Sequence, residues 1–154
     1  MRNLVLIFAA VLMSVSAFAG VDNLIERNGK YYGEDGLLFS GRFENTYDNG
    51  ATKAIFTLVR GNKHGLANTY YVSGEQKEMG GYANGLKDGK WVKWNKEGVK
   101  VSEAYYKNGQ KTGNWTIWDD NGTVRYELEY ANGQKTGEWK VYDENGKLTQ
   151  EINY

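Results

Sequence analysis

Cysteine is absent from this sequence of 154 residues, and histidine occurs once, as His64. Without cysteine the chain can form no disulfide, offers no thiol nucleophile and carries no cysteine to which a lipid could be attached. A zinc site draws mainly on cysteine and histidine, so a single histidine does not predict one. Stability therefore has to come from side-chain packing and backbone hydrogen bonds.

Proline is also absent, whereas glycine occurs 20 times and aromatic residues make up 14% of the chain. Proline removes a hydrogen-bond donor from a sheet, so its absence suits continuously paired strands. Aromatic side chains suit pleated, half-buried surfaces. After the N-terminal region, no segment shows a sustained helical period of apolar residues. The composition therefore indicates an all-β fold.

An excess of charge of one sign is missing as well, because basic and acidic residues number 19 each. Arg2 is the one charged residue among the first 19, so the remainder carries 18 basic and 19 acidic side chains. This balance argues against nucleic acid or a strongly anionic membrane surface as the partner.

The first 19 residues have the pattern of a secretory signal peptide. Arg2 gives a positive start, and residues 4–18 form an apolar run shorter than the roughly 20 residues that a membrane-spanning helix needs. Ala17, Ala19 and Gly20 fit the small-residue site of signal peptidase, with cleavage before Gly20. Residues 1–19 are therefore predicted to be removed, no transmembrane span is expected in the rest, and the mature chain is expected to be secreted or periplasmic.

A period of 24 residues runs through the rest of the chain. Four columns show it best: Gly61, Gly85, Gly109 and Gly133; Tyr82, Tyr106, Tyr130 and Tyr154; Trp91, Trp115 and Trp139; and Lys63, Lys87, Lys111 and Lys135. The pattern predicts a repeat domain over residues 37–154, with approximate units 37–60, 61–84, 85–108, 109–132 and 133–154. The first unit is degenerate, and residues 20–36 are predicted to be an atypical N-terminal cap.

Each unit is predicted to hold two short strands. In the unit 109–132, residues 114–118 and 123–130 have strand character, residues 119–122 form a turn, and residues 132–137 lead to the next unit. Asn-Gly is the strongest short hairpin signal, because a type I′ turn needs positive φ at both central residues. The predicted fold is an elongated, single-layer antiparallel meander of tandem 24-residue β-hairpins.

Two aromatic columns mark candidate binding residues. They lie three residues apart on one strand, so they point to opposite faces and cannot both be buried on one side of a thin sheet. Packing accounts for most of these rings, but at least one column is expected to remain partly accessible to a ligand. The candidate residues are Trp91, Trp94, Trp115, Trp118, Trp139 and Tyr142.

The motif Tyr-x-Asn-Gly-x-x-x-Gly-x-Trp at residues 106–115 resembles the MORN repeat, and with the Trp-x-x-Asn-Gly at residues 118–122 it resembles the bacterial variant in YwqK-family antitoxins. The resemblance covers about residues 37–154. It implies a twisted antiparallel sheet of successive hairpins without a catalytic centre, and a role as a scaffold for protein partners, with lipid contact in some members.

The sequence contains no convincing motif for catalysis, phosphate binding or metal binding. His64 stands at a loop position filled by other residues in later units, and the segment 85–90 departs from a phosphate-binding loop. A calcium-binding loop that began at Asp119 would end at Tyr130, where such a loop needs a glutamate. The column Glu103, Glu127 and Glu151, alongside the repeating lysines, is interpreted as a solvated face with cross-strand charge pairs. No enzyme activity, cofactor or metal is expected.

The sequence thus favours an exported scaffold that binds another protein through a sheet face or its terminal edge strand. Edge pairing with a second copy is also open, although Glu151 and Asn153 could discourage it. The alternatives are a module that binds carbohydrate or cell envelope through its aromatic columns, and an antitoxin or immunity protein against an exported effector.

Overall fold

A computed structural model describes residues 24–154, so the signal-peptide prediction for residues 1–19 lies outside the described residues. The strands are β1 (Ile25–Arg27), β2 (Lys30–Tyr32), β3 (Gly41–Thr46), β4 (Thr52–Val59), β5 (Asn62–Tyr70), β6 (Gln76–Ala83), β7 (Leu86–Trp94), β8 (Lys100–Lys107), β9 (Gln110–Trp118), β10 (Val124–Ala131), β11 (Gln134–Tyr142) and β12 (Leu148–Asn153). Over the described range, the chain contains no helix of the length and apolar character needed to cross a bilayer.

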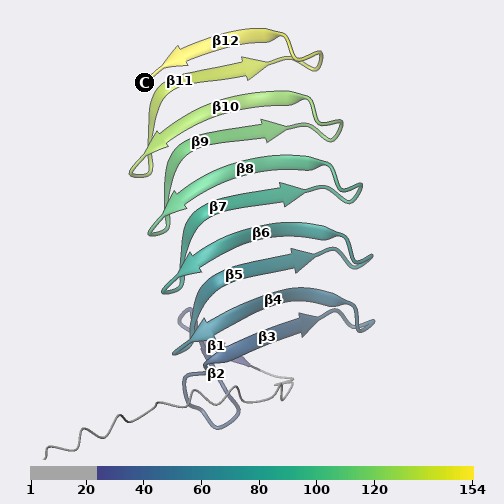
Figure 1. Cartoon of the computed structure of the whole chain (residues 1–154), viewed down its shortest axis with the longest axis vertical. Coiled ribbons are helices and arrows are strands. Elements are labelled where there is room, and N and C mark those ends of the chain that lie inside the picture. Colours follow the sequence, from purple (N-terminus) through teal and green to yellow (C-terminus); the bar gives the residue numbers. More distant parts are fainter. Residues whose placement is uncertain (1–23) are drawn as a thin grey trace, which may run out of the picture.

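Strands β3 to β12 form one antiparallel sheet in which each strand pairs with its neighbours in sequence. Figure 1 shows these strands stacked in chain order along the long axis, and within residues 24–154 the one other sheet is the small β1–β2 hairpin near β3 and β4. Contacts are therefore mainly between strands adjacent in sequence, as in other repeat architectures. The predicted all-β meander of successive hairpins is confirmed.

The two edges of the sheet carry different turns. At one edge, Asn84, Asn108 and Asn132 have φ near +50° and are each followed by a glycine with positive φ, which is type I′ geometry. At the other edge, the Asp119 carboxylate accepts hydrogen bonds from the backbone N–H groups of Asn121 and Thr123. The Asn-Gly pairs therefore do not all adopt one turn type, since the asparagine before Gly122 keeps negative φ.

The strands are longer than the sequence predicted. Residues 132–137 were expected to lead from one unit to the next, but only Asn132 and Gly133 form the turn, and β11 begins at Gln134. The strand can continue because of Gly137, four residues after Gly133. Gly137 has φ +64°, and the register shifts beside it, so the strand bends without ending. The equivalent bends of β5, β7, β9 and β11 appear in Figure 1 near the edge with the Asn-Gly turns.

One continuous ladder of aromatic rings forms the core. Neighbouring rings along it have centroids 4.9 to 6.2 Å apart, in the order Tyr82, Trp91, Tyr106, Trp115, Tyr130, Trp139 and Tyr154. Trp91 and Trp115 are 4% and 9% exposed, and Ala104 is buried between them. Such tilted and edge-on ring pairs stabilise beyond their burial alone. A single sheet thereby obtains a core by packing the side chains of successive repeats against each other.

In the first repeat the core contains a similar pair of one large and one small residue, but the two strands exchange which residue is large. Gly80 pairs with Trp91, and a Cβ at Gly80 would lie 2.1 Å from an atom of the indole ring. One repeat earlier the pair is Phe56 and Ala67, so the large ring comes from the other strand. The exchange leaves a cavity of about 70 Å³ beside Ala67, bounded by Phe56, Tyr82 and Trp91 among others.

Residues 24–40 form a separate hairpin, β1–β2, and a connecting segment beside the first repeat (Figure 1). The Tyr31 N–H donates to the Gly61 carbonyl at 2.9 Å, and the Gly61 N–H donates to the Phe39 carbonyl at 2.7 Å. The Tyr31 ring packs 5.5 Å from that of Phe56. Burial raises the pKa of Tyr31 to about 12. The N-terminal hairpin thus adds a ring at the end of the sheet where the tryptophan is missing.

Candidate binding surfaces

Alternation along the strands assigns every paired side chain to one of two faces. We call the side that carries the ring ladder from Tyr82 to Tyr154 the ladder face. The opposite side, which carries Trp94, Trp118 and Tyr142, is the open face. The prediction that the two aromatic columns point in opposite directions follows from this register, in which Trp91 faces Ala104 and Trp94 faces Lys100 across a bulge.

The ladder-face tryptophans are held in one geometry. Their indole Nε1–H groups donate to backbone carbonyls ten residues earlier, from Trp91 to Gly81, from Trp115 to Tyr105 and from Trp139 to Glu129, at 2.9 to 3.1 Å. Trp91 and Trp115 are buried, and Trp139 is half-buried near the last strand. We therefore assign Trp91 and Trp115, which the sequence offered as candidate ligand contacts, to the core.

The lysine column lies on the same rings and does not pair with the glutamate column, so that part of the charge-pair prediction is wrong. The Lys87 Nζ lies 3.7 Å from the centroid of Trp91 and 5.0 Å from that of Tyr106. The Lys111 Nζ has the same relation to Trp115 and Tyr130, at 4.6 and 4.7 Å. The register explains this, because Lys111 faces Tyr106 on the ladder face, whereas Glu103 and Glu127 point to the other side.

The open face carries an aromatic row that is half-buried. Tyr70, Trp94, Trp118 and Tyr142 all retain exposed surface and occupy the same position in successive repeats. They occur on every second strand, so neighbouring positions are about 9.6 Å apart at the usual strand spacing. Of the predicted candidates, Trp94, Trp118 and Tyr142 are thus brought into one accessible row, apart from Trp91, Trp115 and Trp139.

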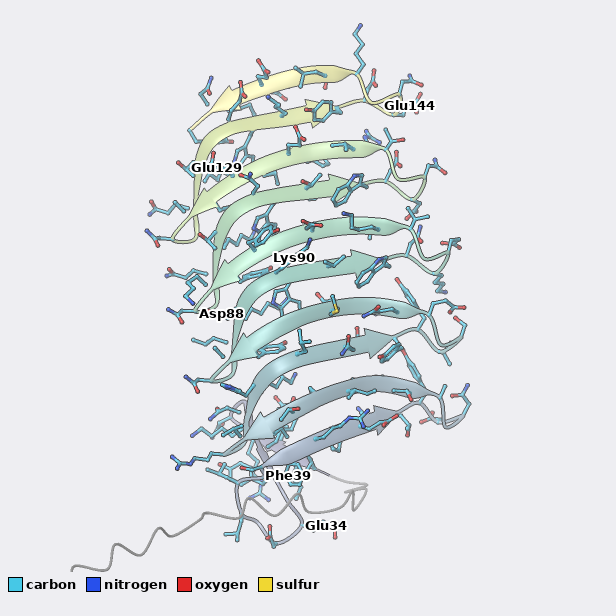
Figure 2. All side chains as sticks on the ribbon, in the orientation of Figure 1. Glu34, Phe39, Asp88, Lys90, Glu129 and Glu144 are labelled. Carbon is cyan, nitrogen blue, oxygen red and sulfur yellow. The ribbon has the colours of Figure 1, made fainter. Side chains whose placement is uncertain are left out.

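Charged side chains link this row to the middle of the open face. The Lys100 Nζ lies 4.3 Å from the centroid of the Trp118 ring and 3.0 Å from Glu103 Oε2, and Lys90 reaches the other oxygen of Glu103 at 2.8 Å. The hydrogen bond from Lys90 lowers the pKa of Glu103 below its ordinary value and raises that of Lys90. Figure 2 shows Lys90 over the middle of the sheet.

A groove of about 360 Å³ crosses β9, β10 and β11 beside the aromatic row. Its lining consists of Asn114, Trp115, Thr116, Glu127, Leu128, Glu129, Glu138 and Lys140. The Tyr142 hydroxyl donates to the Glu127 carboxylate at 2.6 Å, which joins the groove to the row and raises the pKa of Tyr142. Lys140 is paired with Glu138 at 2.9 Å. With three carboxylates and one ammonium, the groove suits a cationic group.

Sequence reasoning identified the open-face aromatic residues but not this groove. Glu129 and Glu138 belong to no repeating column, and they come from neighbouring strands. Only the strand register, which places Glu127 opposite Lys140 and brings Glu129 to the same face, reveals their proximity. Figure 2 shows Glu129 toward the edge with the Asn-Gly turns, whereas Glu144 lies in a turn at the opposite edge.

Other possible chemistry finds little support in the described residues. Between residues 24 and 154 no group of three or more His, Asp or Glu side chains could hold a metal ion. His64 lies in β5, not in a loop as expected, and it is an exposed residue opposite Thr57. The arrangement on the open face, with aromatic rings beside paired charges, suits binding.

Comparison with known protein families identifies three segments, residues 87–108, 111–132 and 135–154, that match the MORN repeat variant. They correspond to three tandem repeats at the C-terminal end of the sheet. No curated protein matches the chain. MORN repeats are in general repeat modules that bind proteins or membranes.

Proposed function

We propose that this chain is a non-enzymatic repeat scaffold that binds a protein partner on its open face. The observation that carries the proposal is the accessible row of Trp94, Trp118 and Tyr142 next to the acidic groove. Tryptophan and tyrosine dominate the binding energy of many protein interfaces, particularly where polar groups surround them. The row supplies aromatic rings and the groove supplies polar groups, and both lie on the same face of the sheet.

The groove favours a protein over a neutral ligand. Glu127, Glu129 and Glu138 are all exposed, and one ammonium, that of Lys140, faces them. A lysine or arginine side chain from the partner would complement the remaining carboxylates, and opposite charges across an interface speed association and exclude wrong partners. The partner surface that fits is therefore one with an apolar patch beside a basic side chain.

We further propose that the scaffold acts outside the cytoplasm and belongs to the bacterial, YwqK-like type of this repeat. The support for export is the sequence of residues 1–19, with its apolar run and the residues Ala17 and Ala19 before Gly20. N-terminal sequencing of the protein from the source cells tests this directly. A chain that begins at Gly20 supports export, and a chain that retains residues 1–19 contradicts it.

Site-directed photo-crosslinking tests the protein-binding proposal. A photoreactive phenylalanine analogue is placed at Trp118 in one variant and at Tyr126 in a matched control. Tyr126 is 41% exposed but lies on the ladder face, opposite Ile117. Irradiation of source cells is expected to give a discrete protein adduct at position 118 and little at position 126. Equal yields at both positions, or no adduct at position 118, would contradict binding on the open face.

Carbohydrate is the second candidate, and the regular spacing of the aromatic row favours it. Rings about 9.6 Å apart could stack on alternate sugars of an extended chain. Tryptophan fluorescence titrated with neutral envelope glycans distinguishes the candidates. Saturable quenching that is lost in Trp118→Ala would assign the row to sugar binding, whereas the absence of any response leaves the protein partner as the explanation.

A further inference from the structure

The balanced net charge of the chain conceals a separation of charge between the two faces. The paired positions of the ladder face hold five lysines, Lys63, Lys87, Lys93, Lys111 and Lys135, and one carboxylate, Glu78. The open face has the opposite excess. Its paired carboxylates include Glu44, Asp88, Glu103, Glu127, Glu129, Glu138 and Glu151, and its paired basic residues are Arg42, Lys90, Lys100, Lys107 and Lys140. The near-zero total therefore does not exclude an anionic partner for the ladder face.

Four of the five lysines form one row across the strands. Lys63, Lys87, Lys111 and Lys135 occupy the same position in successive repeats, so their backbones are about 9.6 Å apart, two strand spacings. Each ammonium lies over a tyrosine ring of the ladder, at 5.3 Å for Lys63 and Tyr82, 5.0 Å for Lys87 and Tyr106, and 4.7 Å for the last two pairs. Each cation of the row is thus held over one ring of the ladder.

Most of these ammonium groups lack a carboxylate partner. Glu78 lies 3.7 Å from Lys87 and 3.5 Å from Lys93. Among residues 24–154, Lys111 and Lys135 contact rings and tyrosine hydroxyls, with Lys135 3.0 Å from the Tyr154 oxygen, but form no salt bridge. Burial lowers the pKa of Lys87, so its charge is incompletely compensated. Within residues 24–154, three of the four ammonium groups in the row, those of Lys63, Lys111 and Lys135, thus have no carboxylate partner, which favours a ligand with regularly spaced anionic groups.

We propose that the ladder face binds a linear anionic polysaccharide that carries one acid group per disaccharide. In an extended chain, a disaccharide spans close to the distance between successive lysines. The acid groups would meet the ammonium groups of Lys87, Lys111 and Lys135, which the rings of Tyr106, Tyr130 and Tyr154 hold in place. The polymer runs along the sheet, perpendicular to the strands. This surface is separate from the open face, so the proposal does not rest on the proposed protein partner.

The spacing argues against the other anionic polymers. Phosphates in each strand of a DNA duplex follow one another at about 3.4 Å along the axis, much more closely than the lysines. A lipid surface offers anionic groups without a fixed period in one direction, so it would not require equal steps between lysines. One cation per repeat, at an interval close to the length of a disaccharide, matches an acidic sugar polymer best.

Calorimetry at low salt tests the proposal with a defined probe, an octasaccharide of alternating glucuronate and N-acetylglucosamine. The mature chain is expected to bind it, and the double variant Lys111→Gln/Lys135→Gln is expected to weaken binding at least tenfold. Lys96→Gln, in an exposed turn, is the matched control and should bind like the native chain. The variant Lys111→Arg/Lys135→Arg keeps both positive charges and should therefore retain most of the affinity. That result would attribute the loss in the glutamine variant to the missing charges.

Three results would overturn the proposal. The native chain could fail to bind the octasaccharide, the double glutamine variant could bind it as tightly as the native chain, or a neutral octasaccharide of N-acetylglucosamine could bind equally well. Vesicles containing phosphatidylserine serve as a further probe. If they bind through Lys111 and Lys135 and the octasaccharide does not, the row is a membrane contact instead. None of these results bears on crosslinking at Trp118, so the two proposals fail separately.

Discussion

The two faces of this sheet use the same residue types for different purposes. On the ladder face, Trp91 and Trp115 are buried and their indole N–H groups are bonded to the backbone. On the open face, Trp94 and Trp118 are half-buried, and among residues 24–154 neither indole N–H has a hydrogen-bond partner. A tryptophan column in a thin repeat protein is therefore not evidence of a binding site by itself. The face on which it lies decides its role.

Removing a ladder tryptophan should have the largest effect on stability. Trp91→Ala deletes a ring that contacts Tyr82 and Tyr106 and leaves a hole in the core. The free energy of unfolding should fall by about 3–5 kcal/mol, the usual range for a buried tryptophan. Urea denaturation followed by circular dichroism measures it. A loss below about 1 kcal/mol, the scale of an exposed substitution, would mean that the ladder is not the core.

A methyl group at Gly80 should come next. Its Cβ would lie 2.1 Å from a Trp91 ring atom, so Gly80→Ala must displace the indole, and overpacking of this kind costs about 1–3 kcal/mol. Gly89→Ala is the matched control because Gly89 has open space around its Cβ position but φ +79°. Only the backbone penalty applies there, roughly 1 kcal/mol. In urea denaturation, a control that loses as much as Gly80→Ala would show that contact with Trp91 is unimportant.

The open-face substitution Trp118→Ala should lower the free energy of unfolding by only about 1 kcal/mol, because it removes a half-exposed ring and the Lys100 contact without opening the core. It should nevertheless weaken binding to the crosslinked partner at least tenfold, as expected of an interface anchor. Denaturation and a binding titration on the same preparation measure the two quantities. Unchanged affinity, or a stability loss equal to that of Trp91→Ala, would remove the distinction between the faces.

The smallest effect concerns the charge pairs of the open face. Glu103→Gln should lower stability at neutral pH by about 0.5 kcal/mol, since Lys90 and Lys100 lose their shared partner at a partly exposed site. The pKa of Glu103 is depressed in the folded chain, so its contribution is present above its unfolded pKa, ordinarily 4.5, and is lost as the pH falls through the folded pKa. The stability curves of the two proteins should therefore converge in acid. If the stability difference between the native chain and Glu103→Gln widened on acidification, the prediction would be wrong.

Much of the fold follows from the repeat, because a 24-residue period with turn residues at fixed positions permits little besides successive hairpins. The sequence could not show how the strands bend. Gly137 looks like part of a linker until its positive φ is seen to continue the strand through a bulge. The size exchange between Phe56–Ala67 and Gly80–Trp91 is also hidden, because the pairing of these residues depends on the register that the bulge sets.

The binding surfaces were predicted less completely, for a related reason. Spacing alone placed Trp91 and Trp94 on opposite faces but could not say which face is buried. It also associated the repeating lysines with the glutamate column, whereas the bend brings Lys87 onto Trp91 and leaves Glu103 to Lys90 and Lys100. Side-chain neighbours in this protein are decided by the bend within each repeat, which periodicity does not encode.

Hydrogen exchange of the five indole N–H groups tests the difference between the faces most directly. Nitrogen-15 labelling of tryptophan gives one NMR signal for each, and single substitutions assign them. We expect slow exchange for Trp91 and Trp115, intermediate exchange for Trp139 near the last strand, and fast exchange for Trp94 and Trp118. Exchange at similar rates for all five, or protection of Trp94 and Trp118 above Trp91 and Trp115, would contradict it.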